Sequence, residues 1–279
     1  MTIGNRIRPK KRLGQHFLKD QGIIHHIIER AGFCDTDFVL EIGPGLGALT
    51  LPLAGSVRQI VAVEKDSDLI EVLEDNIKKA GIGNVTVVNE DILRFDMSQL
   101  PVVPGEKIKA IGNLPYNISS PFLEKLIGNR SLISQAVLML QFEFARRLMA
   151  SPGGKDYGAM TVLTQYHAAV SPVLEVSRDS FYPKPKVGSM VLTVNMESPH
   201  PRKTEDGDKF KKIVRGSFAH RRKTLLNSLN GAISSLEKKE ILQLLEACGI
   251  DPGRRAETLD IDEFLSITSA AIEAYSEKL

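Results

Sequence analysis

The first half of the chain alternates short apolar runs with longer amphipathic segments, beginning at residue 38. Apolar runs of about four to eight residues are typical of buried strands, whereas apolar positions three or four apart are typical of helices. Strands are therefore expected at residues 38–42, 59–63, 85–88, 108–111 and 136–140. Helices are expected between them, at residues 48–54, 67–80, 121–128 and 143–150. This alternation predicts a parallel sheet of the α/β class with helices on both faces.

The pattern changes after residue 157. Residues 170–176 and 190–196 resemble strands and flank a proline-rich stretch, so they are expected to form two edge strands that close the sheet. Residues 198–208 are polar and contain two prolines, which indicates a linker. Residues 209–279 show helical periodicity alone and predict a small helical domain.

The composition is that of an ordinary globular protein, with 42% hydrophobic and 25% charged residues. Cys34 and Cys248 are too few for a disulfide framework and are typical of a reducing compartment. The six histidines have no metal-ligand spacing, so no metal is expected. No stretch approaches the roughly 20 apolar residues of a membrane span, and the basic N-terminus lacks the apolar core of a signal peptide. We expect a cytoplasmic protein that acts as a monomer away from membranes.

The formal net charge of +2 conceals an uneven distribution. Residues 1–26 hold six basic residues and one acidic residue, and residues 202–223 hold nine basic and three acidic residues. This layout indicates a polyanionic partner held at the two basic segments, although solvated surfaces would give the same pattern. The residues expected to contact phosphates are Arg215, Arg221, Arg222 and Lys223, with Arg222 on a helix face beside an apolar stripe that starts at residue 210. The residues expected to form a basic arm are Arg6, Arg8, Lys10, Lys11 and Arg12.

A glycine-rich turn follows the first expected strand, where residues 41–47 read Glu-Ile-Gly-Pro-Gly-Leu-Gly. Glycines allow a sharp turn and let the backbone approach a ligand closely. Ligands of parallel sheets bind at the carboxyl ends of the strands, so Gly43 and Gly45 are expected to contact a nucleotide-like cofactor. With Ala48 they also satisfy the dinucleotide pattern G-x-G-x-x-A, which leaves a nicotinamide-dependent dehydrogenase open.

Two acidic residues follow the next strands of the expected sheet. Glu64 comes 21 residues after Gly43, where a carboxylate accepts hydrogen bonds from ribose hydroxyls. Asp91 follows the third strand and is expected to accept from an adenine amine. Single acids after strands are common, but the succession of Gly43, Glu64 and Asp91 predicts a nucleoside pocket.

The fourth strand runs into Asn113, Leu114, Pro115 and Tyr116, and this stretch suggests methyl transfer to an adenine amine. That amine is a poor nucleophile because its lone pair is delocalised into the ring. The Asn113 side-chain oxygen and the Leu114 carbonyl are expected to accept its two hydrogens and free the lone pair. Pro115 fixes the turn, and Tyr116 offers a flat face for the base.

The reaction expected there needs positioning and charge alignment rather than a strong general base, because the methylated ammonium loses its proton readily. A base inside a stack is out of reach, so the base is expected to be extruded or single-stranded. Phe181 is expected to form the wall of the base site opposite Tyr116, since the prolines after it hold that loop rigid. A core anchor is the alternative role for Phe181.

Taken together, the motifs resemble those of the ribosomal RNA small-subunit adenine dimethyltransferase family, of the KsgA type. The resemblance covers about residues 8–264, with a phenylalanine at residue 142 where the family more often has a lysine. It is carried by residues 11–18, 41–47, 63–66, 90–91, 113–119, 157–158, 181–189 and 221–229.

The resemblance implies a Rossmann-like, seven-stranded methyltransferase sheet with a small all-helical C-terminal domain. The chain would then divide into a basic arm with cofactor-covering helices at 1–37, a methyltransferase domain at 38–197, a linker at 198–208 and an RNA-contacting domain at 209–279. It also implies S-adenosylmethionine as the cofactor, with Gln15 and its neighbours closing over it. The implied cofactor contacts are His16, Leu18, Gly43, Glu64, Asp91 and Asn113.

The substrate implied is two adjacent adenosines in the 3′-terminal hairpin of small-subunit ribosomal RNA, each dimethylated within a pre-ribosomal particle. Two alternatives stay open beside the dehydrogenase. One is a large-subunit ribosomal RNA methyltransferase of the antibiotic-resistance type, against which the basic run at residues 221–229 argues. The other is a non-catalytic RNA-binding assembly factor.

Overall fold

The computed structural model describes residues 9–103, 105–233 and 235–275 of the chain. The chain divides into two compact units, each held together by contacts among its own residues. The first comprises residues up to 145 together with residues 169–198, and the second comprises residues 146–168 together with the chain from residue 199 onward. Among the helices that the structure describes, none has the length and apolar character to cross a membrane.

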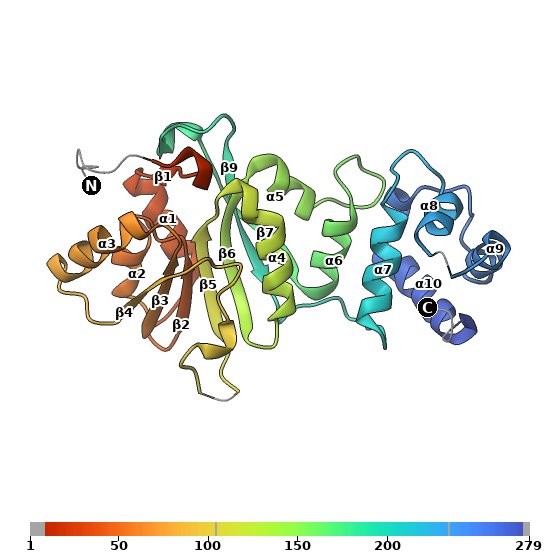
Figure 1. Ribbon diagram of the computed structural model, residues 1–279, viewed down its shortest axis with the longest axis horizontal. Coiled ribbons are helices and arrows are strands. Elements are labelled where there is room, and N and C mark those ends of the chain that lie inside the picture. The colour runs from red at the N-terminus through yellow and green to blue at the C-terminus, as the bar shows by residue number, and fades with distance from the viewer. Residues whose placement is uncertain (1–8, 104, 234, 276–279) are drawn as a thin grey trace. The chain divides into compact units, whose positions relative to one another are not determined.

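The first unit is built on a seven-stranded sheet in the order β4-β3-β2-β5-β6-β9-β7 (Figure 1). Its strands are β2 (Phe38–Ile42), β3 (Gln59–Glu64), β4 (Val85–Asn89), β5 (Ile108–Asn113), β6 (Ile133–Gln141), β7 (Ala169–Val176) and β9 (Ser189–Asn195). Strands β2 to β6 pair in parallel, whereas β9 runs antiparallel to both of its neighbours. The predicted Rossmann-like methyltransferase sheet is confirmed.

The expectation of two edge strands at the end of the sheet is wrong for one of them. Strand β9 lies between β6 and β7, so β7 alone forms that edge. The side chains explain the order, because Val191 and Leu192 are both buried although they point to opposite faces. Strand β7 instead carries the exposed Pro172, which has no backbone N–H to donate and is tolerated at an edge.

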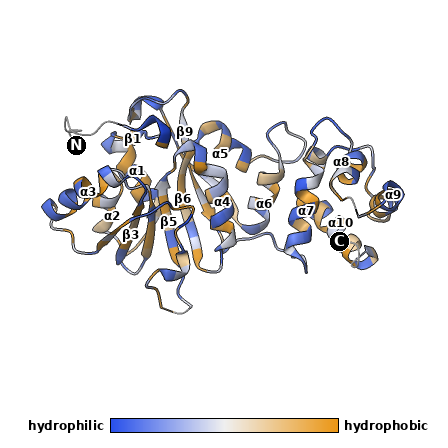
Figure 2. Cartoon of the chain, viewed as in Figure 1, coloured by the Kyte–Doolittle hydropathy of each residue, from blue (hydrophilic) through white to orange (hydrophobic). Residues whose placement is uncertain are grey.

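Helices cover the sheet, and aspartate caps explain where two of them begin. They are α1 (Gln21–Ala31), α2 (Thr50–Ala54), α3 (Ser67–Lys79), α4 (Ser119–Gly128) and α5 (Phe142–Leu148). The side chain of Asp20 accepts from the amides of Gly22 and Ile23 at the start of α1, and Asp66 accepts from the amide of Asp68 at the start of α3. Figure 2 shows that the strands are mostly hydrophobic, while α3 carries long hydrophilic stretches.

A two-stranded ribbon accompanies the main sheet. Strand β1 (Phe17–Leu18) pairs antiparallel with β8 (Phe181–Tyr182), two segments that are far apart in the sequence. Figure 1 shows β1 beside the teal segment that leads into β9. The ribbon ties the N-terminal arm to the proline-rich stretch of the first unit.

The second unit is helical. Its helices are α6 (Ala159–His167), α7 (Gly207–Ser217), α8 (Leu225–Ala232), α9 (Lys238–Ala247) and α10 (Ile261–Tyr275). Helices α7 and α8 pack so closely that a Cβ atom on Gly216 would lie 2.6 Å from the Cβ of Ala232. The methyltransferase domain expected at 38–197 included residues 146–168. In the structure these residues belong to the second unit, because Tyr157 and Val162 are buried in the same apolar core as Phe210 of α7.

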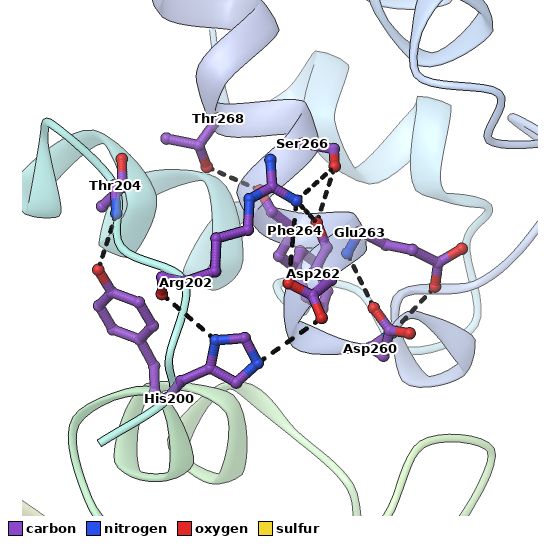
Figure 3. A network of polar contacts seen from close by, with 10 residues as sticks. His200, Arg202, Thr204, Asp260, Asp262, Glu263, Phe264, Ser266 and Thr268 are labelled. Carbon is purple, nitrogen blue, oxygen red and sulfur yellow. Dashed lines mark hydrogen bonds and ion pairs between the residues drawn. The ribbon is translucent and has the colours of Figure 1, made fainter. Parts of the chain in front are cut away.

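The polar stretch expected as a linker at residues 198–208 is bound to the second unit (Figure 3). The guanidinium of Arg202 donates to the carbonyl of Asp262 at 3.1 Å and to the hydroxyl of Ser266 at 3.0 Å, both on α10. The amide of Thr204 donates to the hydroxyl of Tyr166 at 3.0 Å. These bonds fix the segment before α7 begins at residue 207.

Candidate functional site

A pocket of about 170 Å³ opens at the carboxyl ends of β2, β3 and β5 in the first unit. A water molecule needs roughly 10–15 Å³ of such space, so this pocket holds a ligand of many atoms. All the expected cofactor-binding residues and all but one of the expected catalytic residues line it. These lining residues are His16, Leu18, Gly43, Gly45, Glu64, Asp91, Asn113, Leu114, Pro115 and Tyr116.

The turn after β2 has a backbone that favours glycine. Gly43 has a φ of 62° and Gly45 a φ of 58°, in the left-handed region where a side chain is strained. A Cβ atom on Gly45 would also lie 3.2 Å from the ring of Phe17. The N-terminal arm therefore closes directly over the glycine turn.

The carboxylate of Glu64 is held in one orientation at the end of β3. Its Oε2 accepts the amide of Gly45 at 3.1 Å, and its Oε1 accepts the amide of Asp66 at 2.8 Å. Burial raises the pKa of Glu64, and the two amides offset part of that effect. Each carboxylate oxygen keeps a further lone pair, so the group can still accept two ligand hydroxyls.

Asp91 lies in the pocket wall and is held by two donors. Its Oδ2 accepts the ammonium of Lys65 at 2.7 Å, and its Oδ1 accepts the amide of Leu93 at 3.0 Å. Burial alone would raise the pKa of Asp91, but Lys65 and the Leu93 amide outweigh it and hold the pKa below its usual range. Asp91 therefore stays ionised and accepts hydrogen bonds at neutral pH.

Asn113 ends β5 with its side-chain amide anchored. Its Nδ2 donates to the carbonyl of His16 at 2.9 Å, which fixes the orientation of the side-chain amide in the pocket wall. The amide of Leu114 donates to the carbonyl of Met139 on β6 at 3.1 Å, which fixes the peptide that follows Asn113. Asn113 and Leu114 are thus anchored by the N-terminal arm and by β6, and the acceptor role of their oxygens stays a prediction.

Tyr116 is half-buried and its ring is held from two sides. The imidazole of His16 stacks on it with the ring centres 5.7 Å apart and the planes inclined by 29°. The hydroxyl lies 3.2 Å from the hydroxyl of Ser189, and burial raises the pKa of Tyr116. The Nδ1 of His16 lies 2.6 Å from the carbonyl of Pro183, so the histidine joins the pocket to the proline-rich stretch.

Lys10 of the expected basic arm and Gln15, which was expected to close over the cofactor, both bind Asp66. The ammonium of Lys10 lies 2.5 Å from one oxygen of Asp66, and the side-chain amide of Gln15 donates to the other at 2.6 Å. The amide of Lys10 also donates to the side-chain oxygen of Gln15 at 2.7 Å. The order Asp-Ser at residues 66–67 signals a helix cap and gave no hint of this second use of Asp66.

Glu41 is a pocket residue that the sequence reading left unassigned, although an acid within an apolar strand was the signal for it. Its side chain is 1% exposed, and its Oε2 has no hydrogen-bond partner among the described residues. Burial, aided by the nearby Glu64 carboxylate, raises the pKa of Glu41 to about 7. An unpartnered buried oxygen at a pocket is suited to a ligand donor.

The Glu41 carboxyl makes the cofactor-free protein less stable as the pH rises. Because its pKa is 4.5 when exposed and about 7 in the fold, the folded chain holds a proton that the unfolded chain releases between these values. The free energy of unfolding should fall across this range, by about 3 kcal/mol, relative to a Glu41→Gln variant. Urea unfolding of both proteins at pH 5 and pH 8 measures this, and parallel changes in the two would contradict it.

The structure does not bring Phe181 to the pocket. Its side chain is 2% exposed and belongs to the apolar cluster that contains Leu18 and Ile24. In β8 it lies opposite the buried Leu18, so the ribbon turns it toward the core. The alternative role as a core anchor describes its position.

The expected phosphate contacts lie in the second unit and are exposed. Arg215 is on α7, whereas Arg221, Arg222 and Lys223 lie in the turn before α8. Arg222 is therefore not on a face of α7, because that helix ends at Ser217. The guanidinium of Arg221 donates to the carbonyl of Lys155 and lies 4.0 Å from the carboxylate of Glu257.

Two other predictions concern the arm and metals. Arg6 and Arg8 lie outside the described residues. In the part of the chain that the structure describes, no cluster of three His, Cys, Asp or Glu side chains is arranged to hold a metal ion.

Comparison with known proteins extends over nearly the whole chain. A sequence profile described as ribosomal RNA adenine dimethylase matches residues 6–273. The chain belongs to the ribosomal RNA adenine dimethylase family. It is 46% identical over 261 residues to the ribosomal RNA small subunit methyltransferase A of Desulforapulum autotrophicum, covering 94% of this chain and 91% of that one.

Solved structures of similar proteins support this family assignment. A dimethyladenosine transferase from Plasmodium falciparum has a TM-score of 0.79 at 30% identity, covering 94% of this chain and 98% of that one. The 23S rRNA methyltransferase ErmE has a TM-score of 0.68 at 26% identity, covering 91% and 98%. The resemblance predicted from the motifs is confirmed: the chain is an rRNA adenine dimethyltransferase, and the dehydrogenase reading is wrong.

This family is one of S-adenosylmethionine-dependent methyltransferases, and the pocket fits that cofactor. The Glu64 carboxylate, fixed by two amides, retains acceptors for a ribose. The unpartnered oxygen of Glu41 suits a cationic donor such as an amino group. The glycine turn lines the pocket at Gly43 and Gly45, where no side chain takes up space.

Proposed function

We propose that this chain uses S-adenosylmethionine to dimethylate two adjacent adenosines in the 3′-terminal hairpin of small-subunit ribosomal RNA. It acts as a monomer in the cytoplasm, on a pre-ribosomal particle. The observation that carries the proposal is the position of Asn113 at the end of β5, in the wall of the pocket that also holds the Gly43 turn. The near-full-length likeness to relatives named small subunit methyltransferase A supports the choice of subunit.

Asn113 and Leu114 supply the chemistry that this substrate needs. The bound cofactor provides a sulfonium methyl group as the electrophile. The Asn113 oxygen and the Leu114 carbonyl accept the two hydrogens of the adenine amine, which pulls its nitrogen toward a tetrahedral geometry and frees the lone pair. The two residues are held by hydrogen bonds that the Asn113 side-chain N–H and the Leu114 backbone N–H donate to the carbonyls of His16 and Met139, so little reorganisation is needed when the base arrives.

Tyr116 offers a face to the purine ring. Base–aromatic stacking contributes about 1–3 kcal/mol, which offsets the cost of removing the adenosine from its stack. The hydroxyl of Tyr116 is held near Ser189 and its ring near His16, so the face is fixed before the base binds. An adenosine in an unpaired loop costs least to extrude, which favours a hairpin substrate.

The choice of subunit is tested by transfer of labelled methyl groups to purified ribosomal subunits that lack the modification. We expect label in the small subunit alone. The likeness to ErmE keeps large-subunit RNA as the second candidate, and label in that subunit would replace the proposal with it. Particle binding without any label would support a non-catalytic assembly factor instead.

The exposed basic turn before α8 is proposed to contact RNA phosphates. Replacing Arg222 and Lys223 with alanine should weaken particle binding at low salt and lower the slope of log affinity against log salt, by about 0.7–0.9 per lost contact. Replacing the exposed Lys238 and Lys239 at the start of α9 provides a charge-matched control. An unchanged slope in the Arg222 and Lys223 variant would show that the turn does not touch phosphate.

A further inference from the structure

A second aromatic side chain lies beside the pocket in the β1–β8 ribbon. Phe17 is paired with Tyr182, and Leu18 is paired with Phe181. Successive residues of a strand point to opposite faces, and directly opposed residues share a face. Because Leu18 and Phe181 are both buried in one apolar cluster, Phe17 and Tyr182 share the other face.

Tyr182 is exposed on that face, at 48% of its surface. Its partner Phe17 lines the pocket and contacts the glycine turn at Gly45. The carbonyl of the next residue, Pro183, is hydrogen-bonded to the Nδ1 of His16. The ring of His16 in turn stacks on Tyr116. Tyr182 therefore lies immediately outside the wall of the base site, while its ring remains open to solvent.

Exposed basic residues occur in both segments that form the ribbon and beside them in the sequence. The exposed basic residues of the ribbon and of its flanking segments are Lys11, Arg12, Lys19, Arg178, Lys184 and Lys186. Of the nearby acids, Asp179 is paired with Lys184 and Asp20 caps α1. An exposed aromatic ring among cations is the arrangement that proteins use to hold single-stranded nucleic acid, with bases on the ring and phosphates on the cations.

We propose that Tyr182 stacks on an unpaired base of the RNA that lies next to the adenosine in the pocket, with Lys186 contacting its phosphates. This inference rests on the proposed function, because it takes the substrate to be RNA. A duplex hides the faces of its bases, so the ring selects an unpaired segment. Tyr182 is a positioning residue, since it does not line the pocket where the methyl group is transferred.

Binding measurements separate stacking from charge. Tyr182→Ala should weaken the affinity for a single-stranded RNA oligonucleotide about five- to a hundredfold, while Tyr182→Phe stays near the wild type. The salt slope should be unchanged in both, whereas Lys186→Ala should lower it by about 0.7. With ribosomal subunits as substrate, Tyr182→Ala should raise KM and leave kcat and the cofactor Kd unchanged.

The absence of tryptophan from the chain allows a direct probe. Tyr182→Trp keeps an aromatic platform and introduces a single emitter, whose fluorescence should be quenched when the RNA oligonucleotide binds. Val103→Trp is the matched control, because Val103 is 65% exposed and precedes the amino end of β5, whereas the pocket lies at the carboxyl ends of the strands. Equal quenching in the two variants, or none in Tyr182→Trp, would overturn the inference.

The inference and the proposed function can fail separately. If the wild type methylates small-subunit RNA but Tyr182→Ala binds RNA with unchanged affinity and unchanged KM, the stacking role is wrong and the function stands. If the wild type transfers no methyl group to RNA, the proposed function itself is wrong.

Discussion

Replacing Asn113 with alanine is expected to lower the rate constant of methyl transfer by about 10²–10³-fold, the cost of removing one fixed hydrogen-bonding group from a reacting centre. The adenine amine would lose one of its two acceptors, and its lone pair would return to the ring. The affinity for S-adenosylmethionine should change less than tenfold, because Glu64 and Asp91 remain. Single-turnover transfer to small subunits, with cofactor binding by calorimetry, measures both quantities.

Asn113 also donates to the carbonyl of His16, so a loosened arm must be separated from a lost acceptor. Asn113→Asp keeps an oxygen acceptor but removes this donor, and it should retain more turnover than Asn113→Ala. Asn84→Ala is the matched control for stability, because the Asn84 amide donates to the carbonyls of Ala54 and Val57 away from the pocket. Undiminished transfer in Asn113→Ala would remove this residue from the mechanism.

Replacing Glu64 with glutamine is expected to weaken cofactor binding about tenfold to a hundredfold. One carboxylate oxygen would become an amide nitrogen facing the N–H of Gly45 or Asp66, so two donors would oppose each other. Hydrogen bonds to charged groups contribute about 1.5–3 kcal/mol, which sets the size of the loss. Calorimetric titration with S-adenosylmethionine gives the dissociation constant.

Asp68→Asn is the matched control for Glu64→Gln. Asp68 is also acidic and close to the site, but its side chain is 69% exposed and pairs with Lys10 rather than with the pocket. Its replacement should change the dissociation constant less than threefold, since exposed ion pairs contribute about 0.2–1 kcal/mol. Similar losses in both variants would mean that general acidity, not the position of Glu64, attracts the cofactor.

The strands of the sheet were predictable because each is a short apolar run between amphipathic segments. The position of β9 in the sheet was not predictable, since its place between β6 and β7 depends on pairing between residues far apart in the sequence, which leaves no local pattern. The same holds for residues 146–168, which pack with Phe210 through Tyr157 and Val162. Periodicity identifies the buried face of an element but not its partner.

The candidate site was predictable where residues follow strand ends. Glu64, Asp91 and Asn113 were found because the carboxyl ends of parallel strands meet at one edge. Glu41 was missed because it lies within its strand rather than after the strand end, and its signal was only that an acid interrupts an apolar run. At residues 181–182 the aromatic pair was visible, but the register of a two-residue strand decides which ring faces the solvent, and here it is Tyr182.

The most direct test of the central claim, that Asn113 and Leu114 present an adenine amine to a bound methyl donor, is mass spectrometry of RNA from unmodified small subunits. The subunits are incubated with the protein and isotopically labelled S-adenosylmethionine, and the RNA is digested to fragments. We predict N6,N6-dimethyladenosine carrying the label at two neighbouring positions of one hairpin, and its loss with Asn113→Ala. Label on another base, or on a ring nitrogen of adenine, would contradict this account.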